Sequence, residues 1–88
     1  MVSAEVIITN QLGIHARPAS KIVKEASSGR SQVWLIKDGH RINARSILGL
    51  MMMGIEQGAR VTIEVDGPDE NEVLQKLIDL IVNKFGED

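Results

Sequence analysis

Three residues with chemical potential lie together where a loop is expected to become a helix. His15 precedes Arg17 and Pro18, and a proline fits the first turn of a helix because its missing N–H costs little there. The first N–H groups of a helix favour an anion. An N-cap His15 can offer a nucleophilic ring nitrogen, while these N–H groups and the Arg17 guanidinium receive phosphate oxygens. The pattern indicates phosphoryl chemistry, with an ordinary helix cap beside a solvated arginine as the alternative.

The composition argues against several other kinds of site. The 88 residues include no cysteine, which excludes disulfides and thiolate sites, and two histidines alone argue against a dedicated zinc site. A net charge of −2 and only two aromatic residues, Trp34 and Phe85, argue against nucleic acid as a partner. No segment has the pattern of a signal peptide or a membrane span. We therefore expect one cytoplasmic domain over residues 1–88, with no metal, cofactor or membrane partner.

Alternating apolar and polar residues predict the strands that position this loop. The first expected strand leads directly into the His15 loop, and Asp38-Gly39 joins the next two as a hairpin. The expected strands are Val2 to Thr9, Gln32 to Lys37, His40 to Ala44 and Val61 to Asp66.

Apolar residues at helical spacing predict three helices. The first begins at Ala16 and ends at Ser27-Ser28-Gly29, and a short one follows the capping residue Ser46 and reaches Met53. In the last helix, Asp69 and Glu72 have capping-box spacing. Its apolar stripe is Val73, Leu74, Leu77, Ile78, Ile81 and Phe85. The order βαββαβα predicts an antiparallel sheet with helices on one face.

Two motifs resemble one known family. Gly13-Ile14-His15-Ala16-Arg17-Pro18-Ala19 is similar to the active-site signature of HPr, the histidine phosphocarrier of the bacterial sugar phosphotransferase system. Arg45-Ser46-Ile47-Leu48-Gly49-Leu50-Met51 is similar to that family's second motif, at its usual spacing from the histidine. Met52 and Met53 depart from the family pattern. The resemblance implies an α+β fold, an open-faced β-sandwich in which three helices cover one face of a four-stranded antiparallel sheet.

The resemblance also implies a function. His15 is expected to accept phosphate from enzyme I and donate it to enzyme IIA, with Ala16, Arg17 and Pro18 completing the site. The protein is then a transiently phosphorylated substrate of both partners, most simply a monomer, and not an enzyme. Two alternatives stay open: a small phosphatase of the acylphosphatase kind, whose phosphate loop has no match here, and a purely regulatory interaction module.

Further residues are expected to regulate the protein or to bind partners. Ser46 is an ordinary N-cap by type, and the resemblance adds phosphorylation by a dedicated serine kinase, with a phosphorylase to reverse it. A short helix cannot bury every side, so some of its apolar residues should face partners. Of Met52 and Met53, one is expected to be core. The expected partner-binding residues are Ser20, Lys21, Lys24, Ile47, Leu48 and Met51.

Overall fold

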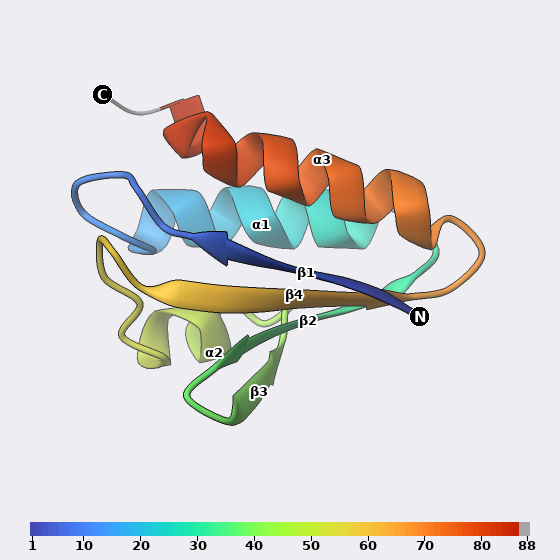
Figure 1. The fold of residues 1–88 in the computed structure, drawn as a ribbon, viewed down its shortest axis with the longest axis horizontal. Coiled ribbons are helices and arrows are strands. Elements are labelled where there is room, and N and C mark those ends of the chain that lie inside the picture. Colours follow the sequence, from blue (N-terminus) through green and yellow to red (C-terminus); the bar gives the residue numbers. More distant parts are fainter. Residues whose placement is uncertain (87–88) are drawn as a thin grey trace.

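The computed structural model describes residues 1–86 and shows helices packed on an open sheet (Figure 1). In chain order, its elements are β1 (Val2–Ile7), α1 (Ala16–Ser28), β2 (Gln32–Lys37), β3 (His40–Asn43), α2 (Ile47–Met52), β4 (Arg60–Asp66), α3 (Glu70–Val82) and a short 3-10 helix η1 (Lys84–Gly86). Within these 86 residues, no helix is long and apolar enough to cross a bilayer.

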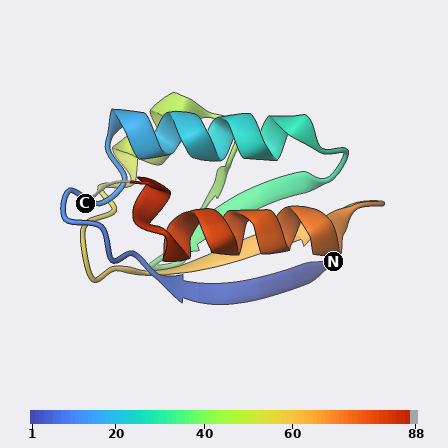
Figure 2. The same ribbon diagram turned by 90° about the horizontal axis from the view of Figure 1, so that it is seen from above.

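The four strands form one antiparallel sheet in the order β1-β4-β2-β3. Helices α1 and α3 lie side by side over one face of this sheet (Figure 2), and α2 packs against α1 and β3. Asp38 and Gly39 both have positive φ, 51° and 80°, as a type I′ hairpin turn between β2 and β3 requires. The predicted α+β fold and hairpin are confirmed.

The core lies between the sheet and the two long helices. Alternate residues of β4 face the helices and are fully buried, and Ile8, just after β1, is buried as the alternation predicted. Burying these apolar side chains is the main stabilising contribution of the fold. The buried side chains of the strands and helices include Val33, Leu35, Val61, Ile63, Val65, Ala19, Ile22, Ala26, Val73, Leu77 and Ile81.

The structure corrects the predicted last helix at both ends. Asp69 makes no capping hydrogen bond, so the capping box with Glu72 is wrong; the Glu70 carboxylate instead accepts from the Gly67 N–H at 3.1 Å. Phe85 is buried as expected, but α3 ends at Val82. Phe85 lies in the following 3-10 helix with φ of 57°, so a change of backbone direction, and not the helical stripe, brings its ring into the core.

Asp69 has a different partner from the one predicted. Its carboxylate accepts hydrogen bonds from the Ser31 hydroxyl and, at 2.9 Å, from the Arg30 N–H. These donors stabilise the charged form, so the Ser31 hydroxyl first and the Arg30 N–H second lower the pKa of Asp69 below its ordinary value. The start of α3 is thereby tied to the loop between α1 and β2.

Candidate functional site

His15 lies at the first turn of α1, as the sequence predicted. It is the N-cap residue, with an extended backbone (φ −97°, ψ −165°), and its carbonyl accepts the first helical hydrogen bond, from the Ala19 N–H at 3.0 Å. The side chain is half-buried and makes no capping hydrogen bond. Pro18 is buried in the first turn. The helix start and the predicted place of the proline are confirmed.

The loop before His15 is fixed to the segment that precedes β4. Gly13 has φ of +66°, and a Cβ built there would lie 2.3 Å from the Ile55 carbonyl oxygen, so only glycine fits. The next residue, Ile14, donates its N–H to the same Ile55 oxygen at 2.9 Å and is buried. The buried Asn10 amide donates to the Gly13 carbonyl at 2.6 Å. The backbone that enters His15 is therefore held in one position.

The surroundings of His15 favour an anion. The first turn of α1 contains no acidic residue, and Ala16 and Arg17 are both exposed there. The exposed guanidinium of Arg17 adds positive charge to the partial charge of the helix N-terminus. Together these groups can receive the oxygens of a phosphoryl group on the His15 ring.

The predicted partner-binding residues of α1 differ in their environments. Ser20 and Lys24 are exposed, as expected for a face that meets partners. Lys21 is half-buried, and its ammonium group donates to the Phe85 carbonyl oxygen at the end of the described chain. Lys24 is thus a solvated charge, whereas Lys21 also fastens η1 to α1.

Helix α2 presents apolar side chains to the surface, as predicted. We call its exposed side chains the α2 patch: Ile47, Leu48, Met51 and Met52, with exposed fractions of 41%, 67%, 44% and 76%. Leu50 is fully buried beneath them, and Met53 is partly buried against the core. The structure therefore answers which methionine is core, since Met53 packs inward and Met52 does not.

Ser46 caps α2 as predicted. Its hydroxyl oxygen accepts a hydrogen bond from the Gly49 N–H at 3.0 Å, and its carbonyl accepts from the Leu50 N–H at 3.0 Å. The side chain is half-buried at the end of the helix that carries the α2 patch. A charge added to this hydroxyl would lie beside that patch.

Two residues near these motifs were not predicted to matter. Leu12, in the loop before His15, is 71% exposed, and the only sequence signal is an apolar residue in a turn. Arg45 belongs to the second motif, yet its guanidinium is used structurally. Its Nε donates to the Ala26 carbonyl at 3.2 Å and its Nη2 to the Ser31 carbonyl at 3.0 Å.

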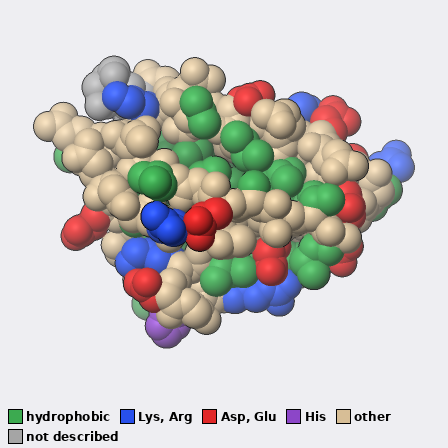
Figure 3. All heavy atoms as spheres, in the orientation of Figure 1, with side chains coloured by type: hydrophobic (Ala, Val, Ile, Leu, Met, Phe, Trp, Pro, Cys, Tyr) green, Lys and Arg blue, Asp and Glu red, His purple; other side chains and the backbone are tan. Residues whose placement is uncertain are grey.

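Charges of both signs are interspersed over the face of the molecule that Figure 3 shows, with hydrophobic side chains among them. No large block of one sign covers this face.

The chain is similar to known proteins over nearly its whole length. A family described as PTS HPr component phosphorylation site matches residues 2–83. Phosphocarrier protein HPr of Cupriavidus necator is 42% identical over 87 residues, 99% of this chain and 98% of that protein. The crystal structure of HPr-C-His from Thermoanaerobacter tengcongensis has a TM-score of 0.96 and 44% identity, covering 100% of this chain and 99% of that one. The Bacillus subtilis catabolite repression protein Crh, a dimer with a swapped domain, has a TM-score of 0.76 and 40% identity, with 96% and 97% covered.

Proposed function

The chain belongs to the HPr family, the phosphocarrier proteins of the phosphotransferase system, and from this premise we propose that His15 is the residue that carries the phosphoryl group. One observation carries the proposal. His15 caps α1 with a partly exposed side chain, on a loop that Gly13 and Ile14 fix to the segment before β4. A carrier needs this combination, because its reactive group must be reachable by two partners and held in the same place for both.

The proposed reaction is a transfer between nitrogen atoms. A ring nitrogen of neutral His15 attacks the phosphorus of a phosphohistidine on enzyme I, and the phosphorus–nitrogen bond of the donor breaks as the new one forms. Arg17 and the N–H groups at the start of α1 balance the charge on the phosphoryl oxygens. Pro18 fixes the helix start, and the small, exposed Ala16 leaves room for the partner beside His15. The reverse attack, by a histidine of enzyme IIA, unloads the carrier.

The partners are proposed to dock on the exposed residues around His15. The α2 patch supplies apolar contact, while Ser20, Lys21 and Lys24 on α1 supply polar and basic contact to acidic partners. Methionine side chains adapt to several surfaces, which suits a carrier with two partners. We propose that the protein works in the cytoplasm as a monomer, in contrast to the swapped dimer of Crh.

Ser46 is proposed to regulate the docking. Phosphorylation by a serine kinase would add a charge of about −2 beside the α2 patch and repel acidic partners. The catabolite repression protein Crh, a structural neighbour, supports a regulatory role within this fold. Incubation with such a kinase and ATP should add one phosphate that mass spectrometry assigns to Ser46, and should lower the rate of phosphorylation at His15.

The deciding experiment is phosphorylation by enzyme I with magnesium and phosphoenolpyruvate. We expect one acid-labile phosphate by intact mass, absent in His15→Ala, and slower transfer in Arg17→Ala with unchanged folding. Circular dichroism should show that both variants fold. Phosphate retained in His15→Ala would refute the assignment. So would the absence of any phosphate when the same enzyme I loads another HPr.

A further inference from the structure

Asn10 is a fully buried polar residue in the loop before His15, and the phosphoryl transfer proposed above gives it no role. The backbone already closes the turn from Asn10 to Gly13, because the Gly13 N–H donates to the Asn10 carbonyl at 3.1 Å. The Asn10 side chain adds a bond from its amide nitrogen to the Gly13 carbonyl at 2.6 Å. Burying an amide costs free energy that its hydrogen bonds must offset. Closure of the turn therefore does not explain why an amide is buried here.

The amide holds one peptide unit, the one between Gly13 and Ile14. The carbonyl of this unit accepts from the Asn10 side chain, and its N–H donates to the Ile55 carbonyl at 2.9 Å. A peptide unit is planar and turns as a whole about the line through its two Cα atoms. Bonds at both of its polar ends oppose that rotation, and loss of the Asn10 amide would remove one of them.

Gly13 makes this restraint necessary. The close approach of its Cα to the Ile55 carbonyl oxygen requires glycine, as shown above. Glycine has more backbone freedom than any other residue, and its φ of +66° lies in a region that it enters and leaves at little cost. The close approach therefore places a flexible backbone joint just before Ile14 and His15. The Asn10 amide removes the freedom that Gly13 introduces.

A fixed Gly13–Ile14 peptide in turn fixes the direction of the nucleophile. The Ile14 side chain is buried in the core, and the His15 carbonyl accepts from the Ala19 N–H at 3.0 Å. The His15 backbone is thus held between two anchored points, and a rotation of the preceding peptide would change the direction in which the imidazole leaves it. In-line transfer depends on such alignment, since a misplacement of about 1 Å can slow a reaction about 100-fold.

We propose that Asn10 is a positioning residue, which acts through the Gly13 carbonyl to hold the His15 ring in line with the phosphoryl group of a partner. This inference rests on the proposed function and adds to it a residue that sets the rate of transfer. The strength of docking should not depend on Asn10, because its side chain is buried and a docked protein does not reach it. Loading and unloading should depend on Asn10 alike, since both use the same His15 ring.

Asn10→Ala tests this role, because it removes the amide and keeps the backbone bond of the turn. We expect kcat for phosphorylation by enzyme I to fall about tenfold while KM stays within about a factor of two, and transfer to enzyme IIA to slow by a similar factor. Backbone ¹⁵N relaxation should give lower order parameters at Ile14 and His15 than in wild type. Asn10→Leu, which has the branched shape of asparagine without its polar atoms, should show the same fall in kcat.

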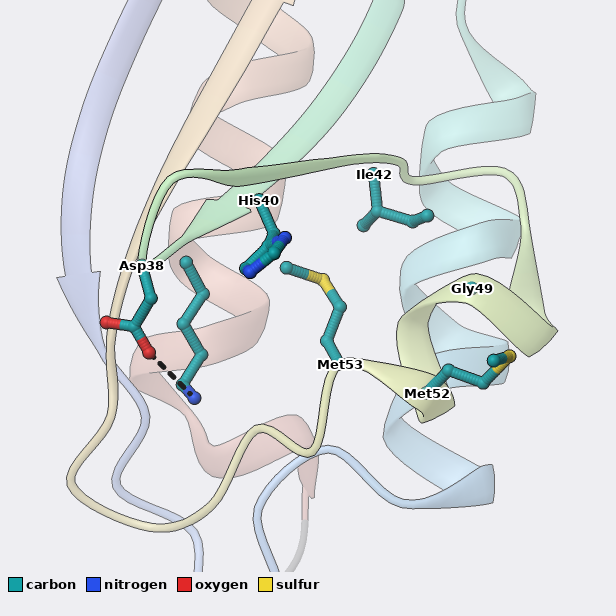
Figure 4. A pocket seen from close by; sticks show the side chains of 7 residues that line it. Asp38, His40, Ile42, Gly49, Met52 and Met53 are labelled. Carbon is teal, nitrogen blue, oxygen red and sulfur yellow. Dashed lines mark ion pairs between the residues drawn. The ribbon is translucent and has the colours of Figure 1, made fainter.

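Two controls separate position from stability. Ser31→Ala is the matched control, because Ser31 is the other buried polar residue among residues 1–86 and lies beyond the far end of α1. It should lower the free energy of unfolding in urea with kcat unchanged. The hollow between the β2–β3 hairpin and α2 (Figure 4) is lined by residues that include His40 and Met53, and the Asn10–Gly13 turn is not among them. His40→Ala should therefore leave kcat unchanged.

Several results would overturn the inference. A kcat for Asn10→Ala within about a factor of two of wild type would do so and leave the proposed function standing. Equal losses of kcat in Asn10→Ala and Ser31→Ala would also do so, because stability and not position would then set the rate. Loss of folding in both Asn10 variants would assign the amide to folding instead. Failure of wild type to be phosphorylated would overturn the proposed function as well.

Discussion

The surroundings of the two ends of α1 (Figure 1) are fastened to the rest of the fold in different ways. At the far end, Arg45 and Asp69 each make two hydrogen bonds to neighbouring segments. At the His15 end, the close approach of Gly13 to Ile55 and a hydrogen bond from the buried Asn10 amide fix the loop, and the apolar side chains of α2 stay at the surface. The difference indicates that polar side chains link separate segments at the far end, whereas the loop before His15 is held by buried groups, and the exposed side chains near it are the ones proposed to meet partners.

Gly13→Ala should have the largest effect, because it disrupts the close approach of Gly13 to Ile55, which is one of the contacts that fix the loop before His15. A Cβ at φ +66° would lie 2.3 Å from the Ile55 oxygen, so we expect a loss of about 2–4 kcal/mol in the free energy of unfolding, with slower phosphorylation. Gly54→Ala is the matched control, since φ there is +64° but nothing lies within 4 Å of the added Cβ. It should cost about 1–2 kcal/mol. Equal losses in urea unfolding would show that the contact with Ile55 does not matter.

Arg45→Ala tests the opposite end. Losing the bonds to the Ala26 and Ser31 carbonyls should lower the free energy of unfolding by about 1–2 kcal/mol, while kcat and KM with enzyme I stay within about a factor of two. Arg45→Lys can reach one carbonyl and should lose less stability. Urea unfolding and phosphorylation kinetics measure the two effects separately. A raised KM with unchanged stability would assign Arg45 to docking and remove the contrast between the ends.

Leu48→Asp tests the α2 patch and should have the opposite outcome to Arg45→Ala, with stability unchanged and docking weakened. Leu48 is 67% exposed, so a charge there should change the free energy of unfolding by less than about 0.5 kcal/mol. The KM for enzyme I should rise about tenfold, because the proposed apolar contact would be lost and the new charge would face the acidic partner proposed above. Val82→Asp, at a site 66% exposed on α3, provides the control. Equal KM values for the two variants would exclude the patch as a docking surface.

The structural features that the sequence predicted best are those that depend only on residues close together in the chain. The alternation around Val61, the Asp38-Gly39 turn and the place of Pro18 each encode a local preference, and the structure confirms all three. The pairing of polar side chains was not predictable in the same way. Arg45 reaches Ala26, and Lys21 reaches Phe85, 64 positions away in the chain. Such bonds depend on which elements meet after packing, and no local pattern records them.

The hydrogen bonds of Asp69 were likewise not predictable from neighbouring residues. Removing its charge gives the smallest change in stability that we predict. Its hydrogen bonds from Ser31 and Arg30 lower its pKa in the folded state below the unfolded value of about 3.9. The bonds therefore add stability above about pH 4, and this contribution is lost as the pH falls through the lowered pKa. Asp69→Asn keeps an oxygen acceptor, so at pH 7 it should lose less stability than Arg45→Ala.

The pH dependence of the stability difference between wild type and Asp69→Asn separates the contribution of the Asp69 charge from that of its shape. Urea unfolding of wild type and variant at pH 7 and in steps to pH 3 should show a difference that shrinks on acidification, because the wild-type carboxylate then takes up a proton. Ser31→Ala removes the strongest donor and should weaken the pH dependence of the remaining carboxylate. A difference of the same size at pH 3 and pH 7 would mean that the far end is held by the fit of the Asp69 side chain. In that case its charge would contribute nothing to the contrast with the His15 end.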